Sequence, residues 1–289
     1  MKQLFTILAA VIICSTATAQ TDSTKHTQKD TIRIGGIVIV KNGKKENDLK
    51  VTMGRKSNDR KRNSNISTNW WIVDLGFANY TDKTNYATAG SYLVSRPGYP
   101  AVGENDFKLR DGKSVNVNIW FFMQRLNLIK HHVNLKYGFG LELNNYRYKS
   151  ALSYKEGGYV PYTAGTQTSA AFIFRDSISF SKNKLAADYL TVPMMLNFTS
   201  NPGRHNKGIS LSAGVSAGYL YGQRNKQISN ERGKNKNRGD YDLNRFKLSY
   251  VAELGLGPVR LYGSYSPKSM YEHSLDMKPY TVGLRFSNW

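Results

Sequence analysis

The chain almost lacks cysteine, because Cys14 is the single one in 289 residues. It lies in a segment with a basic start, a short apolar run and an Ala-x-Ala ending at Ala19, which is typical of a secretory signal peptide. We therefore expect residues 1–19 to be cleaved, leaving no disulfide or thiol chemistry. Two alternatives stay open: a lipoprotein anchored at Cys14, which Ile13 disfavours because a small residue is expected there, and a buried N-terminal element.

Long apolar runs and acidic residues are also scarce. After Ala19 no stretch of eighteen apolar residues occurs, so a membrane-spanning mature chain must be a closed β-barrel. Lys and Arg number 41 against 20 Asp and Glu, a formal net charge of +21. Nucleic acid would suit this charge, but we expect no nucleic-acid partner for an exported chain. Basic segments at 41–62 and 224–238 favour lipopolysaccharide phosphates or other anionic envelope polymers; the alternative is that they are solvated loops.

What the chain does have is a repeated period-two pattern. Val133 to Asn144 is the clearest case, with Val, Leu, Tyr and Phe at odd positions and Asn, Lys, Gly and Glu at even ones. Successive strand side chains point to opposite sides, so this segment has one apolar and one polar face. In Val115 to Gln124, Phe121 and Met123 fall on the apolar face. Eight segments follow the pattern: Trp71 to Ala78, Val115 to Gln124, Val133 to Asn144, Leu190 to Phe198, Ile209 to Tyr219, Phe246 to Leu254, Val259 to Tyr265 and Tyr280 to Phe286.

The connectors alternate in length. Long ones follow the first, third and fifth segments, at 81–112, 150–187 and 223–243, and the last, at 266–277, is intermediate. Outer-membrane barrels have short periplasmic turns and long outer loops. The fold class is therefore all-β: an eight-stranded antiparallel up-and-down transmembrane β-barrel at 68–289. Residues 20–67 form a basic, flexible N-terminal arm in the periplasm, with a short hairpin near Thr31 to Lys41.

A barrel of eight strands has a lumen just wide enough for side chains to fill. We expect a packed polar interior, in which charges must pair because a lone buried charge costs several kcal/mol. The prediction is a lumenal charge network centred on Glu142, Glu253, Arg260 and Arg285. Its structural interpretation is a plug, and its functional alternative is a gate or ion path. The inward charges are Asp74, Lys136, Glu142, Lys247, Glu253, Arg260 and Arg285.

Motifs for catalysis, metals and cofactors are not found. His273, beside Ser274, is the one histidine near a lipid-facing Ser-His arrangement, which would need a base and a third orienting group. A solvated loop histidine is the simpler interpretation. His131 and His132 are adjacent without a cysteine or acidic partner nearby. We expect no enzyme activity, no catalytic, cofactor-binding or metal-binding residues, and no cofactor.

Two strands carry a family resemblance. The segment Tyr189 to Leu196 resembles the "tyrosine-leucine-x-[isoleucine or valine]-proline" strand of the porin-like outer-membrane β-barrel domain family common in Bacteroidetes-type bacteria, and Tyr280 to Phe286 is similar to its closing strand. The resemblance covers about residues 68–289 and implies barrel architecture, with no catalytic residues to carry over. Members are mostly uncharacterised, and some belong to a secretion-linked branch.

These observations predict a barrel of the bacterial outer membrane. The leading hypothesis is a non-catalytic structural or surface-interaction role, in which basic loops contact the outer leaflet or an external partner. The alternative is a small channel, transport or secretion-system accessory barrel. A lipid-modifying barrel enzyme and a soluble periplasmic ligand-binding β-protein rank lower. Expected partners are outer-membrane lipid and lipopolysaccharide, the barrel-assembly machinery and an unidentified envelope protein.

Overall fold

The structure is a computed structural model that describes the backbone of residues 30–34, 37–41 and 49–53, and the whole of residues 64–202, 208–256 and 259–287. The predicted signal peptide lies outside the described residues. The chain divides into two compact units, Met1–Asn63 and Ser64–Trp289. No helix among the described residues is long and apolar enough to cross a membrane.

The first unit contains a small antiparallel sheet. Strand β1 (Asp30–Ile34) pairs with β2 (Ile37–Lys41), in the segment where the sequence predicts a hairpin. Strand β3 (Leu49–Met53) then pairs with β2. This third strand was not predicted in the N-terminal arm at 20–67, and its alternating Leu-Lys-Val-Thr-Met sequence is typical of a strand.

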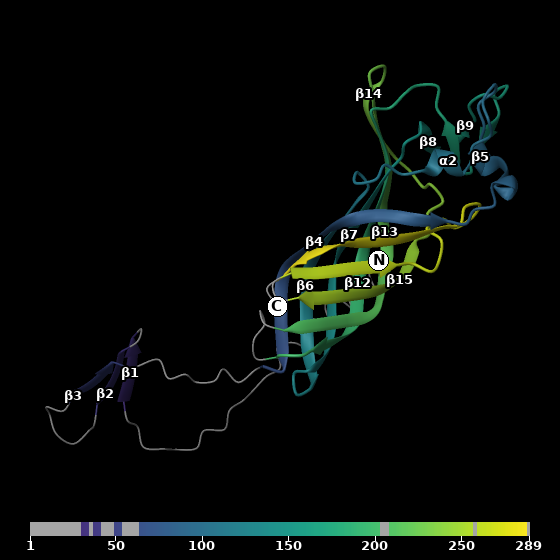
Figure 1. The fold of residues 1–289 in the computed structure, drawn as a ribbon. Coiled ribbons are helices and arrows are strands. Elements are labelled where there is room, and N and C mark those ends of the chain that lie inside the picture. The colour runs from purple at the N-terminus through teal and green to yellow at the C-terminus, as the bar shows by residue number, and fades with distance from the viewer. Residues whose placement is uncertain are drawn as a thin grey trace, which may run out of the picture. The chain divides into compact units, whose positions relative to one another are not determined.

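The second unit is a closed antiparallel ring, seen as the tilted barrel in Figure 1. Each strand pairs with its sequence neighbour, and the last one pairs with the first, so that no edge is left open in the ring. This confirms the predicted fold class, and the first ring strand begins two residues before the predicted start of the barrel at 68. The ring strands are β4 (Ile66–Asp82), β6 (Val115–Ile129), β7 (Val133–Arg147), β12 (Lys182–Thr199), β13 (Ile209–Ser229), β15 (Phe246–Leu256), β16 (Val259–Tyr265) and β17 (Met277–Phe286).

A bulge in β6 changes one predicted face. The pairing of β6 with β7 shifts by one residue between Trp120 and Phe122, so that Phe121 has no partner in β7. Trp71, which lies opposite Phe121 on β4, has a φ of 57°. The extra residue shifts the alternation by one, so Met123, predicted to face lipid, is fully buried in the lumen. Gly140 lies against this bulge, where a Cβ would come within 2.4 Å of the Ile119 carbonyl oxygen.

The polar lumen consequently contains a small apolar cluster. Ile72, Trp120, Met123 and Met195 are buried together, with Val251 packed against them. On the other side of the bulge, the rings of Trp71 and Phe121 meet edge-on at 5.7 Å between centroids. The interior, predicted to be packed and polar, therefore contains an apolar layer at this level of the barrel, because the bulge turns Met123 inward.

The long connectors are folded rather than loose. They lie beyond one end of the ring in Figure 1. Three short strands form a sheet in the order β5-β11-β8, so β11 pairs with β5 and β8. The elements are η1 (Tyr86–Thr88), η2 (Gly90–Tyr92), β5 (Leu93–Val94), α2 (Glu104–Phe107), β8 (Leu152–Lys155), β9 (Gly158–Tyr159), β10 (Gln167–Thr168), β11 (Phe172–Arg175) and β14 (Gly233–Arg238).

Candidate functional site

Glu253 on β15 is the hub of the charges in the lumen. Its carboxylate contacts Lys136 Nζ at 2.8 Å, Arg260 Nη1 at 3.0 Å and Arg285 Nη1 at 2.5 Å. Arg285 also reaches Asp74, with Nε to Oδ1 at 2.8 Å. Five of the seven predicted residues therefore form one buried cluster, which draws on five different strands of the ring.

The other two predicted residues form a separate ion pair. Lys247 donates to Glu142, which also accepts from Asn144 at 3.0 Å and lies near the Thr191 hydroxyl at 3.4 Å. The structure thus places Glu142 beside the hub and not within it. All seven predicted residues have ionic partners, in two groups.

Asparagines join the two groups. Asn144 Oδ1 accepts from Asn116 Nδ2 at 2.9 Å, and Asn116 Nδ2 also lies 2.9 Å from Asn118 Oδ1. Asn118 Nδ2 in turn donates to Asp74 Oδ2 at 3.1 Å, and Trp120 Nε1 donates to the same oxygen at 2.7 Å. The sequence places these side chains on the inward face but does not show that they connect the charges.

The lumen leaves little free space around this network. A cavity of about 30 Å³ remains between Trp120, Glu142, Met195, Tyr262 and Arg285. That volume is about what one water molecule needs. The arrangement can hold charges in place, and it offers no room there for a solute.

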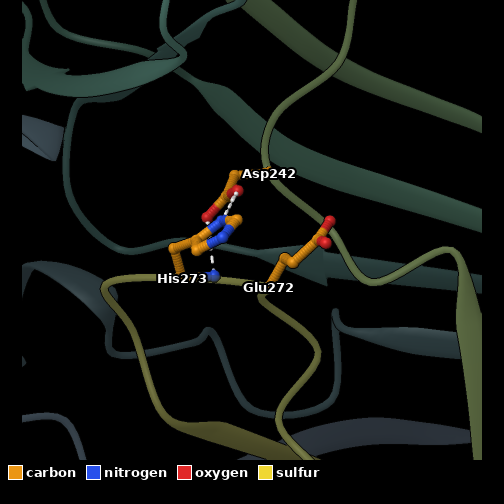
Figure 2. A group of neighbouring side chains, drawn as sticks. All are labelled: Asp242, Glu272 and His273. Atoms are coloured by element: carbon orange, nitrogen blue, oxygen red, sulfur yellow. Dashed lines mark hydrogen bonds and ion pairs between the residues drawn. The ribbon is translucent and has the colours of Figure 1, made fainter.

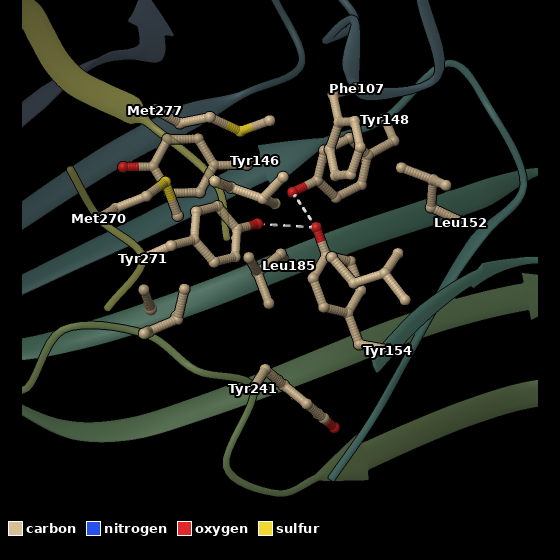
Figure 3. Packing of buried hydrophobic residues seen from close by; sticks show 14 of the residues in the cluster. Phe107, Tyr146, Tyr148, Leu152, Tyr154, Leu185, Tyr241, Met270, Tyr271 and Met277 are labelled. Carbon is tan, nitrogen blue, oxygen red and sulfur yellow. Dashed lines mark hydrogen bonds between the residues drawn. The ribbon is translucent and has the colours of Figure 1, made fainter. Parts of the chain in front are cut away.

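A cluster rich in tyrosine covers the ring at the loop end. Tyr148 and Tyr154 share a hydrogen bond at 2.6 Å, and Tyr154 and Tyr271 share one at 3.0 Å, as Figure 3 shows. We call this cluster the loop cap. Burial of Tyr148 in the loop cap raises its pKa to about 12. The loop cap consists of Ala78, Tyr92, Val102, Phe107, Leu109, Tyr146, Tyr148, Leu152, Tyr154, Ile173, Leu185, Ala187, Tyr189, Leu220, Tyr241, Leu243, Met270, Tyr271, Leu275 and Met277.

Hydrogen bonds tie the connectors of the loop cap together. Tyr92 from the first connector donates to the Tyr241 carbonyl of the third at 2.8 Å. Gln227 from β13 donates to Ser153 of the second at 2.7 Å, and Arg175 pairs with Asp106 at 2.5 Å. Sequence reasoning missed the loop cap because its members come from segments far apart in the chain.

The strand register brings a set of Lys and Arg side chains together on one face at the loop end. β13 and β14 continue beyond the ring as a hairpin, so much of the predicted connector 223–243 is strand. Cross-strand partners share a face, and one row reads Arg147, Lys184, Lys226 and Lys236 on β7, β12, β13 and β14. The neighbouring rows add four more cations. We call the whole set the cationic face: Arg147, Lys182, Lys184, Arg224, Lys226, Lys234, Lys236 and Arg238.

The comparisons with known proteins agree with this fold. The outer membrane protein beta-barrel domain family matches residues 71–269. The chain belongs to this family. Its location is accordingly the bacterial outer membrane, and no curated protein matches the chain.

Solved structures similar to this outer-membrane barrel include Ail, the attachment invasion locus protein of Yersinia pestis. Its complex with the heparin analogue sucrose octasulfate has 12% identity and a TM-score of 0.31, over 76% of this chain and 98% of that one. Ail without the analogue has a TM-score of 0.30 at the same identity and coverage. A Rhodopseudomonas blastica porin triple mutant has 8% identity and a TM-score of 0.17, over 77% of this chain and 100% of that one.

One group of loop residues in this outer-membrane barrel has the composition of a metal or catalytic site. Figure 2 shows Asp242, Glu272 and His273, whose ligand atoms lie within 4.8 Å of one another. His273 Nδ1 lies 2.8 Å from Asp242 Oδ1, and the hydrogen bond and charge of Asp242 raise the pKa of His273. Within the described part of the chain, no serine hydroxyl is hydrogen-bonded to His273. The geometry is that of an exposed His-Asp loop contact.

Proposed function

We propose that this protein is a closed, non-catalytic outer-membrane barrel that acts through its loop-end surface, by contact with the outer leaflet and anionic envelope polymers. The observation that carries the proposal is the cationic face, which gathers eight Lys and Arg side chains on one side of four adjacent strands. With the loop end facing outward, as in outer-membrane barrels, this face meets the cell exterior.

The lumen supports a closed barrel. Glu253 and the four charged side chains grouped with it fill the ring, and the cavity beside Trp120 holds about 30 Å³. The loop cap adds a second, apolar barrier above the charges. A channel would have to disrupt both layers, so the channel alternative has less support than a surface role.

The non-catalytic part of the proposal rests on His273. A nucleophile needs a base within about 2.6–3.2 Å and an orienting group. Asp242 can orient His273, but the hydroxyl of a nucleophile is not hydrogen-bonded to it among the described residues. We therefore expect the mass spectrum of lipid A to be the same with and without the gene.

The decisive experiment measures conductance in planar bilayers. The purified full chain should give no stable conductance steps, while a general porin in the same bilayer gives them. A variant with the loop cap loosened, Tyr271→Ala, should also stay closed because the ion pairs remain. Stable steps from the unmodified protein would refute a closed barrel.

The surface role is tested on intact cells with a soluble polyanion such as dextran sulfate. Cells that produce the protein should retain more of the polymer than cells without it. Equal retention would contradict a surface role based on charge.

A further inference from the structure

The cationic face lies on the same side of the strands as the lipid-facing surface of the barrel, farther toward the loop end. On β12, the even-numbered residues Val192, Met194, Leu196 and Phe198 are 45–53% exposed and face outward. The same parity leads through Leu190 and the buried Asp188 and Ala186 to Lys184 and Lys182. Because side chains two apart share a face, the strand surface changes from apolar to cationic along one line.

Strand β7 repeats the transition at the same level. Its odd-numbered residues are apolar as far as Leu143, and Asn145 and Arg147 follow on that face. Arg147 pairs in register with Lys184, and Lys184 donates to Asn145 Oδ1. Lys184 lies six residues beyond Leu190, which at ~3.3 Å per residue and a tilt of ~40° is about 15 Å along the membrane normal. The cations therefore stand in the headgroup and sugar layer of the leaflet.

Charge on this face is not balanced by acids of the protein. Asp188 is the acid that shares the face on the described part of β12, and it is already paired with Arg224. Lys182 and Lys234 lower the pKa of Lys226 by repulsion. Such a row of like charges is stabilised by external anions.

A cavity adjoins the cationic face beside β13, between the part of β13 that pairs with β15 and the part that pairs with β14. It has a volume of about 470 Å³ and is lined by Arg224, Arg238 and Arg245, with Tyr219 and Tyr221 also in its wall. Asp240 also lines it and lies 3.5 Å from Arg245. Tyr219 and Tyr221 are both nearly half exposed on β13, as residues of an interfacial aromatic belt are. The cavity thus joins the interfacial rings to three guanidinium groups.

Asp188 supplies a second, independent sign of a ligand in this cavity. Its side chain is 3% exposed and lines the cavity, and Oδ2 pairs with Arg224. Its buried Oδ1 has no hydrogen-bond partner among the described residues. A buried carboxylate oxygen without a donor is costly, and a sugar hydroxyl in the cavity would supply that donor.

We infer that the cationic face and this cavity bind lipopolysaccharide of the protein's own leaflet, with phosphates against the lysines and arginines and a phosphorylated sugar in the cavity. A lipid-anchored ligand is favoured over a soluble polymer because the face lies on the same side of β7 and β12 as their lipid-facing surface. Arginine is suited to phosphate through paired hydrogen bonds. This inference rests on the proposed outward orientation and surface role.

The test measures how much rough lipopolysaccharide, consisting of lipid A and inner core, the full chain retains in detergent. The variant carries Lys226→Gln, Lys234→Gln, Lys236→Gln and Arg238→Gln together. We expect affinity to fall at least roughly tenfold, ~1.4 kcal/mol. The matched control changes four exposed lysines in other connectors, Lys108, Lys113, Lys155 and Lys268, to Gln with the same loss of charge. It should retain lipopolysaccharide within about twofold of the unmodified chain.

Three further arms identify the ligand chemistry. Dephosphorylated lipopolysaccharide should bind the unmodified chain as weakly as intact lipopolysaccharide binds the variant. Phosphatidylglycerol vesicles should not compete, because they lack the sugar. Asp188→Ala should weaken lipopolysaccharide binding, and a higher salt concentration should not reverse this loss. Heat-modifiable gel migration shows that each variant is a folded barrel.

The inference is overturned if the fourfold variant of the cationic face and the fourfold control retain lipopolysaccharide equally. It is also overturned if dephosphorylation of lipopolysaccharide does not weaken binding, or if soluble polyphosphate competes as well as lipopolysaccharide does. Its failure is distinguishable from failure of the proposed function. Conductance steps, or cells that retain no dextran sulfate, would contradict the proposed function. Retention of dextran sulfate with equal lipopolysaccharide binding by both variants would contradict the inference alone.

Discussion

The lumen and the loop cap close the same ring with opposite chemistry. In the lumen, the buried Lys136, Arg260 and Arg285 contact Glu253, and Arg285 also contacts Asp74. In the loop cap, Tyr148 and Tyr154 are six positions apart in the chain, and Tyr271 comes from a segment 117 positions after Tyr154. These tyrosines pack with Leu and Met side chains. One closure is ionic and the other is apolar.

The difference follows from what surrounds each region. The outer face of the ring is apolar, so the alternating positions that remain for the lumen are polar and must satisfy one another. The loop cap has water outside it and can bury apolar surface as a soluble domain does. A barrel in lipid is thus polar inside, and its cap at the loop end is apolar inside.

The largest expected effect comes from removing the ionic hub. Glu253→Gln leaves Lys136, Arg260 and Arg285 without its charge, and breaking a buried ionic contact costs about 3–5 kcal/mol. The free energy of unfolding, measured by urea titration in lipid vesicles with tryptophan fluorescence, should fall by that amount. Asp240→Asn, which loses a 3.5 Å contact between exposed side chains, should cost less than ~1 kcal/mol. Similar losses for both would mean that the network does not stabilise the ring.

The loop cap should respond locally rather than globally. Tyr271→Ala removes a fully buried ring, for which about 3 kcal/mol is expected. Hydrogen exchange and proteolysis should increase in the connectors, while heat-modifiable migration of the barrel stays unchanged. Tyr159→Ala, at a ring that is 72% exposed, is the control and should change neither. Loss of the whole barrel in Tyr271→Ala would show that the two closures are not separable.

Strongly alkaline pH should open the loop cap. Burial raises the pKa of Tyr148 from 10.0 to about 12, so the neutral phenol is favoured in the folded cap. The stabilisation is fully present below pH ~10 and is lost as the pH rises through about 12, a change of roughly 2–3 kcal/mol. The part of the tyrosinate absorbance that comes from the buried loop-cap tyrosines should rise together with protease sensitivity. Ionisation of all tyrosines near pH ~10 without proteolysis would contradict a dry cap.

The smallest effect concerns the exposed loop contact at His273. Asp242 raises the pKa of His273, so the contact is fully present below the ordinary histidine pKa and is lost as pH rises through the raised value. Proteolysis of residues 266–276 should increase slightly over that interval. His273→Gln should remove the pH dependence. A pH dependence that persists in His273→Gln would assign it to another group.

Much of the fold could be predicted because a barrel in lipid constrains its sequence strongly. Period-two alternation located all eight ring strands, and side-chain burial along β7 alternates from Val133 to Arg147 without an exception. It failed at Met123, where the bulge at Phe121 shifts the phase by one residue. No local pattern marks that bulge, since it depends on the facing Trp71.

Alternation along each strand is a local property, so the closed ring, its lipid-facing surface and the inward position of the seven charges could be predicted from the sequence. Long-range contacts make Glu253 the hub, pair Glu142 with Lys247 outside that hub, and seal the ring with the tyrosines of the connectors. The tertiary structure also aligns the cations of four strands into one face. These outcomes depend on strand register and on contacts between residues more than a hundred positions apart, such as Lys136 and Glu253, which no local pattern encodes.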